Sequence, residues 1–258
     1  MPTHCIAISK QPYGGIHMNN AIRLFTLAYA GGNAYIYNSW KKSLQPQIEL
    51  IPIELPGHGA RISEPLVSDT QSIVNDIWQH IQPYFQDHRP FAFFGHSMGS
   101  ILAFEMIHKV YTETGRYPVT SLFSGRVAPH IRSEKQWSKL PDQAFIEKVI
   151  TLGGIPDVIL EHKELLEMII PVLRADFSLV EQYRYDRQYK VFPFPIIVLT
   201  GKQDQMTTID IEAWSEYSSL DATFKSYDGG HFFINTCAEQ VLADIRMILL
   251  EHERSLSL

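Results

Sequence analysis

The stretch that most constrains the fold is a short apolar segment, residues 91–94, that runs into Gly95-His96-Ser97-Met98-Gly99 and then into a helical apolar pattern. It predicts a buried strand, a tight turn at Ser97 and a helix. Glycine suits both flanks of this turn, because a Cβ there would collide with the neighbouring strand and helix. The free N–H groups at the start of the helix favour negative charge near Ser97. On this stretch alone, a purely structural Gly-Ser turn stays open.

Apolar, β-branched segments recur along the chain, and helical patterns separate them. The predicted strands are residues 22–28, 48–53, 91–94, 119–125, 194–201 and 222–227. The predicted helices outside the middle of the chain are residues 35–44, 73–85 (with Asp69 as N-cap), the helix after Ser97, and 239–251. This alternation predicts an α/β fold with a mostly parallel central sheet and helices on both faces. With 258 residues, 45% of them hydrophobic, the chain can bury one large core, so we expect a single domain over residues 1–258.

The alternation stops between residues 129 and 185, where the patterns are helical only. Leu140-Pro141-Asp142 opens one helix, and Gly153-Gly154-Ile155-Pro156 ends it. Residues 164–170 predict a second helix, and residues 171–183 a third that begins at a proline. A helical insertion of this size suggests a lid over residues 130–185. The alternative is a helical pair that only decorates the sheet edge.

Composition excludes several classes of partner. The net charge is −6 and there is no basic tract, so we expect no nucleic-acid partner. No apolar run reaches the roughly 18 residues that span a bilayer, and residues 1–20 are polar and do not resemble a secretory signal. Cys5 and Cys237 are too far apart in sequence to suggest a disulfide scaffold or a metal site, which fits a reducing cytoplasm. We expect a cytoplasmic monomer that does not bind membranes.

Three residues with complementary chemistry each follow a predicted strand. A serine hydroxyl needs a base to take its proton, and the base needs an acid to orient it. The carboxyl ends of parallel strands meet at one edge of a sheet, so Ser97, Asp204 and His231 are expected to converge there. Their order along the chain, Ser, Asp, His, is that of α/β-hydrolases, in which G-x-S-x-G forms the nucleophile elbow.

Other residues could supply the base or the acid. Among the 11 histidines, we expect the ring of His96 to point away from the serine and His58 to be structural in its turn. The rivals for the acid are Asp210 and Asp221, in polar segments, and Asp228, which is too close in sequence to His231 to orient it easily.

Two backbone N–H groups are expected to stabilise an oxyanion, those of Met98 and Ala30. Ala30 belongs to the Gly-Gly loop Tyr29-Ala30-Gly31-Gly32 that follows the first strand. An ordinary strand-to-helix turn is the alternative for this loop. The chemistry of such a site needs no metal and no cofactor, and the sequence shows no ligand cluster for either.

The chain resembles type II thioesterases, the stand-alone editing hydrolases of polyketide synthases and nonribosomal peptide synthetases. The resemblance covers nearly the whole chain after about residue 22. The segments that carry it are Leu24-Phe25 with Tyr29-Ala30-Gly31-Gly32, Leu55-Pro56-Gly57-His58-Gly59-Ala60-Arg61, Gly95 to Gly99, Ser124-Gly125-Arg126 with Ala128-Pro129, Gly153 to Pro156, Glu164-Leu165, Pro171 to Asp176, and Gly229-Gly230-His231-Phe232-Phe233. The chain departs from the family at Ala28, where proline is usual, and at His58, where arginine is usual.

The resemblance implies the α/β-hydrolase fold and hydrolysis of acyl groups held as thioesters on the phosphopantetheine arm of acyl- or peptidyl-carrier domains. Removal of stalled or wrong acyl groups would restore the free thiol of the carrier. The implied reaction passes through an acyl-enzyme on Ser97. Three alternatives stay open: a product-releasing thioesterase, a small-molecule esterase, and a non-catalytic binding protein with a hydrolase fold.

Overall fold

The computed structural model describes residues 21–155, 157–186 and 189–256, and a six-stranded sheet forms its centre. The strands are β1 (Ile22–Leu27), β2 (Ile48–Pro52), β3 (Phe91–His96), β4 (Thr120–Ser124), β5 (Ile196–Gly201) and β6 (Ala222–Tyr227). They lie in the order β2-β1-β3-β4-β5-β6, and each neighbouring pair is parallel. The predicted parallel α/β sheet is confirmed. The predictions for residues 1–20, which include Cys5, lie outside the described residues.

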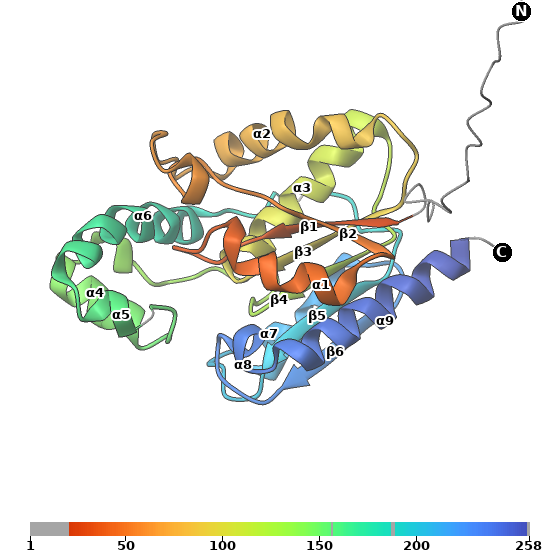
Figure 1. Ribbon diagram of the computed structural model, residues 1–258. Coiled ribbons are helices and arrows are strands. Elements are labelled where there is room, and N and C mark those ends of the chain that lie inside the picture. The colour runs from red at the N-terminus through yellow and green to blue at the C-terminus, as the bar shows by residue number, and fades with distance from the viewer. Residues whose placement is uncertain (1–20, 156, 187–188, 257–258) are drawn as a thin grey trace, which may run out of the picture.

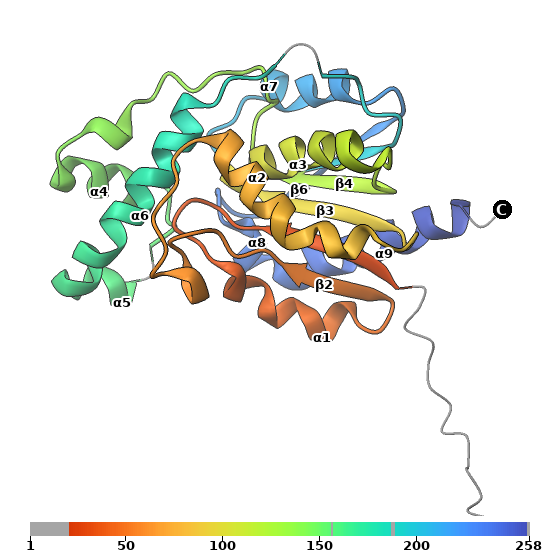
Figure 2. The ribbon, with the colours of Figure 1, turned by 90° about the horizontal axis from the view of Figure 1, so that it is seen from above.

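Helices cover both faces of the sheet (Figures 1 and 2). On one face lie α2 (Thr70–Ile81) and α3 (Met98–Thr114), and on the other lie α1 (Lys41–Leu44) and α9 (Ala238–Leu256). Strand β1 shows why two cores result. Phe25 and Leu27 point into the core with α2 and α3, whereas Ile22 and Leu24 point into the core with α1 and α9, as the two-residue period of a strand requires.

The first helical segment differs in type from the prediction. Residues 35–44 were expected to form one helix, and they form a 3₁₀ helix, η2 (Ala34–Trp40), followed by the short α1. Tyr37 and Trp40 are nonetheless both buried. In a 3₁₀ helix, residues three apart are eclipsed, so this pair shares one face without an α-helical turn. Asp69 is the N-cap of α2 as predicted, because its carboxylate accepts the Ser72 N–H at 2.8 Å, but α2 begins at Thr70 rather than at residue 73.

The remaining elements complete the chain between the strands. They are η3 (Gly59–Arg61), η4 (Gln82–Phe85), η5 (Trp137–Lys139), α4 (Asp142–Ile150), α5 (Asp157–Leu160), α6 (Lys163–Gln182), α7 (Thr208–Glu212), η6 (Ala213–Tyr217) and α8 (Phe233–Thr236). Of these, α4 to α6 form the helical insertion between β4 and β5. The insertion lies beyond one end of the sheet (Figures 1 and 2) and has its own apolar cluster around Phe145 and Val149.

One prediction within the insertion is wrong. A helix break was expected at Pro171, but α6 runs without interruption through it. A proline removes one backbone hydrogen bond and strains the helix by roughly 3 kcal/mol, which packing along a long helix can offset. Three α6 side chains at three-residue spacing, Leu173, Asp176 and Leu179, are buried. All three lie after Pro171, so the C-terminal half of α6 is the part that buries side chains.

The strand order places a topological switch point between β1 and β3, at the carboxyl edge of the sheet. From β1 the chain crosses to β2 on one side, and it later returns to β3 on the other side of β1. The loops that follow β1 and β3 therefore lead away in opposite directions, and ligands bind at such a switch point in open parallel sheets.

Candidate active site

Ser97 lies at the turn between β3 and α3 in a strained backbone conformation. Its φ is 55° and its ψ is −112°, and it is the one non-glycine residue of the described chain with a positive φ. Such strain persists only where the surroundings enforce it. A Cβ on Gly95 would lie 2.0 Å from the Gly99 carbonyl oxygen, and a Cβ on Gly99 would lie 2.1 Å from the Leu27 carbonyl oxygen. Glycine at both flanks is therefore required by close backbone approach, as predicted.

A chain of hydrogen bonds links Ser97, His231 and Asp204. The Nε2 atom of His231 lies 3.0 Å from the Ser97 Oγ, and its Nδ1 atom lies 2.8 Å from the Asp204 Oδ2. Asp204 follows β5 and His231 follows β6, and both side chains are largely buried. The carboxylate can only accept, so the His231 Nδ1 carries the proton and Nε2 faces the serine as an acceptor. This is the geometry of a base and its orienting acid.

Tight packing of β5 on β6 brings the acid and the histidine together. A Cβ on Gly201 would lie 2.2 Å from the Gly230 carbonyl oxygen. The Lys202 N–H donates to the Tyr227 carbonyl at 2.9 Å, and the Gln203 N–H donates to the Gly229 carbonyl at 3.0 Å. The two loops thus continue the strand pairing past the ends of the strands. Their register places Asp204 opposite His231.

The rival acids are engaged elsewhere or exposed, and Asp204 is the acid that is hydrogen-bonded to His231. Asp228 is exposed and pairs with Lys202 at 2.7 Å, Asp210 lies in the first turn of α7, and Asp221 is exposed just before β6. The ring of His96 is fully buried, with its Nδ1 2.8 Å from the Ser124 Oγ. Burial holds the pKa of His96 well below its usual value. His96 is therefore a neutral part of the core beneath the elbow.

The two predicted oxyanion donors lie at the start of the loop after β1 and at the start of α3. Met98 is the first residue of α3, so its N–H has no acceptor within the helix. Ala30 follows β1, and no acceptor among the described residues takes its N–H. The next residue, Gly31, has φ +77°, and its N–H donates to the Asp176 Oδ2 at 2.7 Å.

Comparison with known proteins identifies the family. The family model described as a thioesterase domain matches residues 22–249. The chain belongs to the thioesterase family. This thioesterase is 30% identical to ClbQ from the colibactin NRPS/PKS pathway, whose crystal structure it matches with a TM-score of 0.87 over 92% of this chain and 100% of that one. It is also 30% identical to the type II thioesterase BorB from the borrelidin biosynthetic cluster, with a TM-score of 0.79 over 90% and 93% of the two chains.

A relative found by sequence comparison carries the name of linear gramicidin. The thioesterase is 36% identical over 233 residues to linear gramicidin dehydrogenase LgrE of Brevibacillus parabrevis, and the aligned residues make up 88% of each chain. The name of LgrE describes a dehydrogenase, whereas the loop after β1 here reads Tyr29-Ala30-Gly31-Gly32-Asn33 rather than the G-x-G-x-x-G of dinucleotide-binding folds. The predictions of a type II thioesterase, a serine hydrolase acting on thioesters and an α/β-hydrolase fold are confirmed.

The helical insertion of the thioesterase contacts two loops at the carboxyl edge of the sheet, the loop after β1 and the loop that carries His231. On one side, the side chain of Leu173 from α6 packs on Gly31, and a Cβ on Gly31 would lie 2.4 Å from the Leu173 Cδ2. On the other side, Phe232, the neighbour of His231, packs on Gly154 in the same way. The ring of Phe232 also meets that of Tyr29 edge-on, with centroids 4.8 Å apart. The insertion is thus seated on the two loops that flank Ser97.

Sequence reasoning did not predict the burial of Asp176 beside the loop after β1. Asp176 was noted only as part of a motif in the insertion, yet it is 1% exposed and accepts from the Gly31 N–H and the ring of His58. His58 was expected to be structural, and it is buried in this contact. The available signal was the spacing: Asp176 stands three residues after Leu173, on the apolar face of a helix. A carboxylate at such a position is expected to have a partner, because carboxylates are almost never buried without one.

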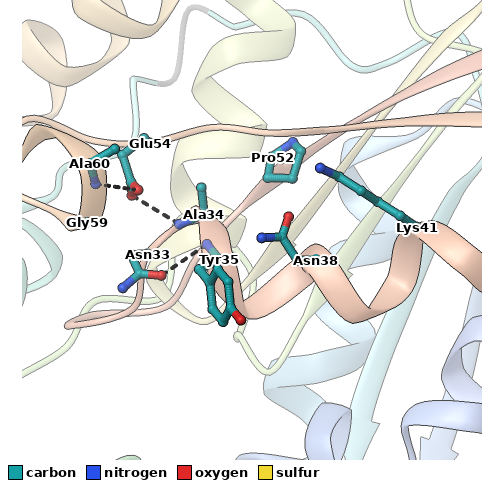
Figure 3. Close-up of a pocket in the computed structure, with 9 residues that line it drawn as sticks. All are labelled: Asn33, Ala34, Tyr35, Asn38, Lys41, Pro52, Glu54, Gly59 and Ala60. Atoms are coloured by element: carbon teal, nitrogen blue, oxygen red, sulfur yellow. Dashed lines mark hydrogen bonds between the residues drawn. The ribbon is translucent and has the colours of Figure 1, made fainter.

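A separate surface hollow of about 470 Å³ lies between η2 and the turn at Gly59. The Glu54 carboxylate is at its edge and accepts from the Ala34 N–H at 3.0 Å and the Ala60 N–H at 3.2 Å (Figure 3). Ser97, Asp204 and His231 do not line this hollow. Across the described residues, no helix combines the length and apolarity that a membrane span needs.

Proposed function

We propose that this thioesterase hydrolyses acyl groups from the phosphopantetheine arm of carrier proteins, and so edits stalled or misprimed polyketide synthases or nonribosomal peptide synthetases. The observation that carries the proposal is the hydrogen-bonded chain from Ser97 through His231 to Asp204 at the switch point of a parallel sheet. The likeness to ClbQ of an NRPS/PKS pathway and to the type II thioesterase BorB supports the choice of substrate class.

In the proposed first step, the Ser97 Oγ attacks the thioester carbonyl carbon while His231 Nε2 takes the hydroxyl proton. The Asp204 carboxylate keeps the proton on Nδ1 and stabilises the imidazolium. The carbonyl oxygen becomes an oxyanion that accepts from the N–H groups of Met98 and Ala30. The N-terminus of α3 adds the field of its helix dipole to this stabilisation.

Collapse of the tetrahedral intermediate breaks the carbon–sulfur bond and leaves the acyl group as an ester on Ser97. The leaving thiolate takes the proton from His231, which restores the neutral imidazole. Water then attacks the ester as His231 removes its proton, and the same proton returns to the Ser97 Oγ when the carboxylic acid leaves. The carrier thiol is free for a new acyl group.

We further propose that residues 130–185 act as a lid on this single domain. Three observations support this role: the separate apolar cluster of the insertion, the packing of Leu173 on Gly31, and the packing of Gly154 on Phe232. The lid would shape the acyl pocket and offer the carrier domain a docking surface. We expect the enzyme to act as a cytoplasmic monomer.

The test follows the acyl group by intact-protein mass spectrometry. An acetyl-phosphopantetheine carrier domain is mixed with the wild-type enzyme, with Ser97→Ala, or with Ser72→Ala, which removes an exposed serine hydroxyl and serves as the matched control. The same acyl group is offered on coenzyme A and as a simple oxygen ester.

Loss of the acetyl mass from the carrier with wild type and Ser72→Ala, but not with Ser97→Ala, supports the proposal. Slower hydrolysis of acetyl-coenzyme A and of the oxygen ester than of the loaded carrier supports carrier recognition. Turnover by Ser97→Ala at the wild-type rate would contradict the role of Ser97. A preference for the oxygen ester, with the loaded carrier left intact, would make the protein a small-molecule esterase.

A further inference from the structure

A buried acid–imidazole pair lies beside the loop that holds Ala30. The side chains of Asp176 and His58 are only 2% and 3% exposed. The His58 Nε2 lies 3.0 Å from the Asp176 Oδ2, and the His58 Nδ1 lies 2.9 Å from the Pro56 carbonyl oxygen. The same Asp176 oxygen accepts the Gly31 N–H at 2.7 Å.

The partners of His58 define its charge. A backbone carbonyl oxygen can only accept a hydrogen bond, and so can an ionised carboxylate. Both ring nitrogens of His58 therefore donate, which makes the ring an imidazolium. Its positive charge compensates the buried carboxylate of Asp176, which would otherwise be costly to remove from water. The pair is thus ionic on both sides.

The pair joins three segments that are far apart in sequence. Asp176 belongs to α6 of the insertion, His58 to the turn after β2, and Gly31 to the loop after β1. Glu54 makes a second link between the same two loops, because it accepts from Ala34 and Ala60 (Figure 3). Gly31 directly follows Ala30, so a carboxylate that holds the Gly31 N–H fixes the Ala30–Gly31 peptide. That peptide is joined through the Ala30 Cα to the one that carries the Ala30 N–H, and it limits how far the Ala30 N–H can turn.

We propose that the protonated His58 ring and Asp176 form a positioning device, which holds the Ala30 N–H toward Ser97 and couples that position to the seating of α6. This inference rests on the proposed function, since it assigns a task to the Ala30 N–H. His58 and Asp176 are positioning residues: they act through Gly31 and the loop, and not on the acyl group itself.

The device depends on pH because a neutral imidazole has one N–H. Once His58 loses a proton, either the Pro56 carbonyl or the Asp176 carboxylate is left without its donor. Burial alone lowers the pKa of His58, but the hydrogen bond and charge of Asp176, the Pro56 carbonyl and the charge of Glu54 outweigh it and raise the pKa. Asp176 on α6 and Glu54 after β2 are the charged groups that act on the ring. The imidazolium therefore persists to higher pH than that of an ordinary histidine, and it is lost as the pH rises through this raised pKa.

The experiment compares wild type with His58→Arg, His58→Gln and Asp176→Asn, and uses His80→Gln, which alters a half-exposed histidine, as the matched control. For each protein, kcat and KM for an acyl-carrier thioester are measured from pH 6 to 10. The rate at which a small fluorophosphonate labels Ser97 is measured over the same range. Circular dichroism and the melting temperature establish that each variant is folded.

We expect the wild-type and His80→Gln kcat to fall on the alkaline side, and His58→Arg, whose charge is permanent, to lose that fall. His58→Gln and Asp176→Asn should lower kcat and labelling about tenfold or more at pH 7, with KM changed less than threefold. If His58→Gln is poorly folded, Asp176→Asn and His58→Arg still decide the matter, since the asparagine oxygen can accept from Gly31 and the arginine keeps the charge.

The proposal would be overturned if the kcat of folded His58→Arg fell at alkaline pH in the same way as the kcat of the wild type. Wild-type kcat and labelling in folded His58→Gln would also overturn it. A nitrogen-15 spectrum that shows His58 as a neutral tautomer at pH 7, assigned with the His58→Arg variant, would overturn it too. The labelling rate does not require thioester turnover. A wild type that is labelled at Ser97 but leaves the loaded carrier intact would contradict the proposed function, while its labelling profile would still test the device.

Discussion

The contact between Leu173 and Gly31 provides a stability test of how the insertion sits on the loop after β1. In Gly31→Ala, the new Cβ would lie 2.4 Å from the Leu173 Cδ2, and the residue would keep a φ of +77°. The positive φ costs an L-residue about 1–2 kcal/mol, and the overlap adds about 1–3 kcal/mol. Leu173→Ala alone removes a buried side chain and should cost about 2–4 kcal/mol.

The double variant separates these contributions, because without the leucine side chain the overlap disappears while the φ strain stays. Its loss of unfolding free energy should therefore be smaller than the sum of the two single losses by about 1–3 kcal/mol. Urea denaturation followed by circular dichroism measures all four proteins. Additivity within about 0.5 kcal/mol would refute the reasoning, since it would mean that Leu173 does not press on Gly31 in solution.

Three further predictions concern the elbow, the acid and a buried histidine. Asp204→Asn should lower kcat by about 10⁴-fold, while Asp228→Asn stays within twofold; steady-state kinetics that place the large loss at Asp228 would move the acid there. Gly99→Ala should destabilise the fold by about 3 kcal/mol or more in urea denaturation, because its Cβ would meet backbone atoms 2.1 Å away that cannot rotate aside; a wild-type midpoint contradicts this. Burial lowers the pKa of His108 to about 4, so the unfolded chain binds a proton below pH 6.5 that the folded chain refuses. Stability should fall toward pH 4 by on the order of 3 kcal/mol, and less in His108→Phe; parallel pH curves for the two proteins would exclude His108 as the cause.

The strands and the site geometry could be predicted because their signals are local. The apolar run before Ser97 and the glycines around it specify one turn, and the register of a parallel sheet brings the ends of β5 and β6 to the same edge. Asp204 and His231 each stand a few residues past a strand end. Their convergence follows from topology alone, so a strand assignment accurate to one or two residues is sufficient.

The features that sequence reasoning missed depend on contacts between distant segments. The break expected at Pro171 is a sound reading of helix propensity, but burial of Leu173 and Leu179 against other parts of the molecule decides the outcome. The pairing of Asp176 with His58 spans 118 positions. The position of Asp176 on the apolar face of its helix indicates that it is buried, but no local pattern identifies the distant imidazole with which it pairs.

The loop after β1 links the insertion to the proposed oxyanion donor. Gly31 has Leu173 against its Cα and Asp176 on its N–H, so two successive turns of α6 contact the residue next to the proposed oxyanion donor. A lid that merely covered the acyl chain would need no such contacts. Because the apolar contact and the buried charge both act on Gly31, the position of α6 and the direction of the Ala30 N–H cannot vary independently. Acyl-chain preference and rate constant are therefore expected to change together when the face of α6 that meets this loop is altered.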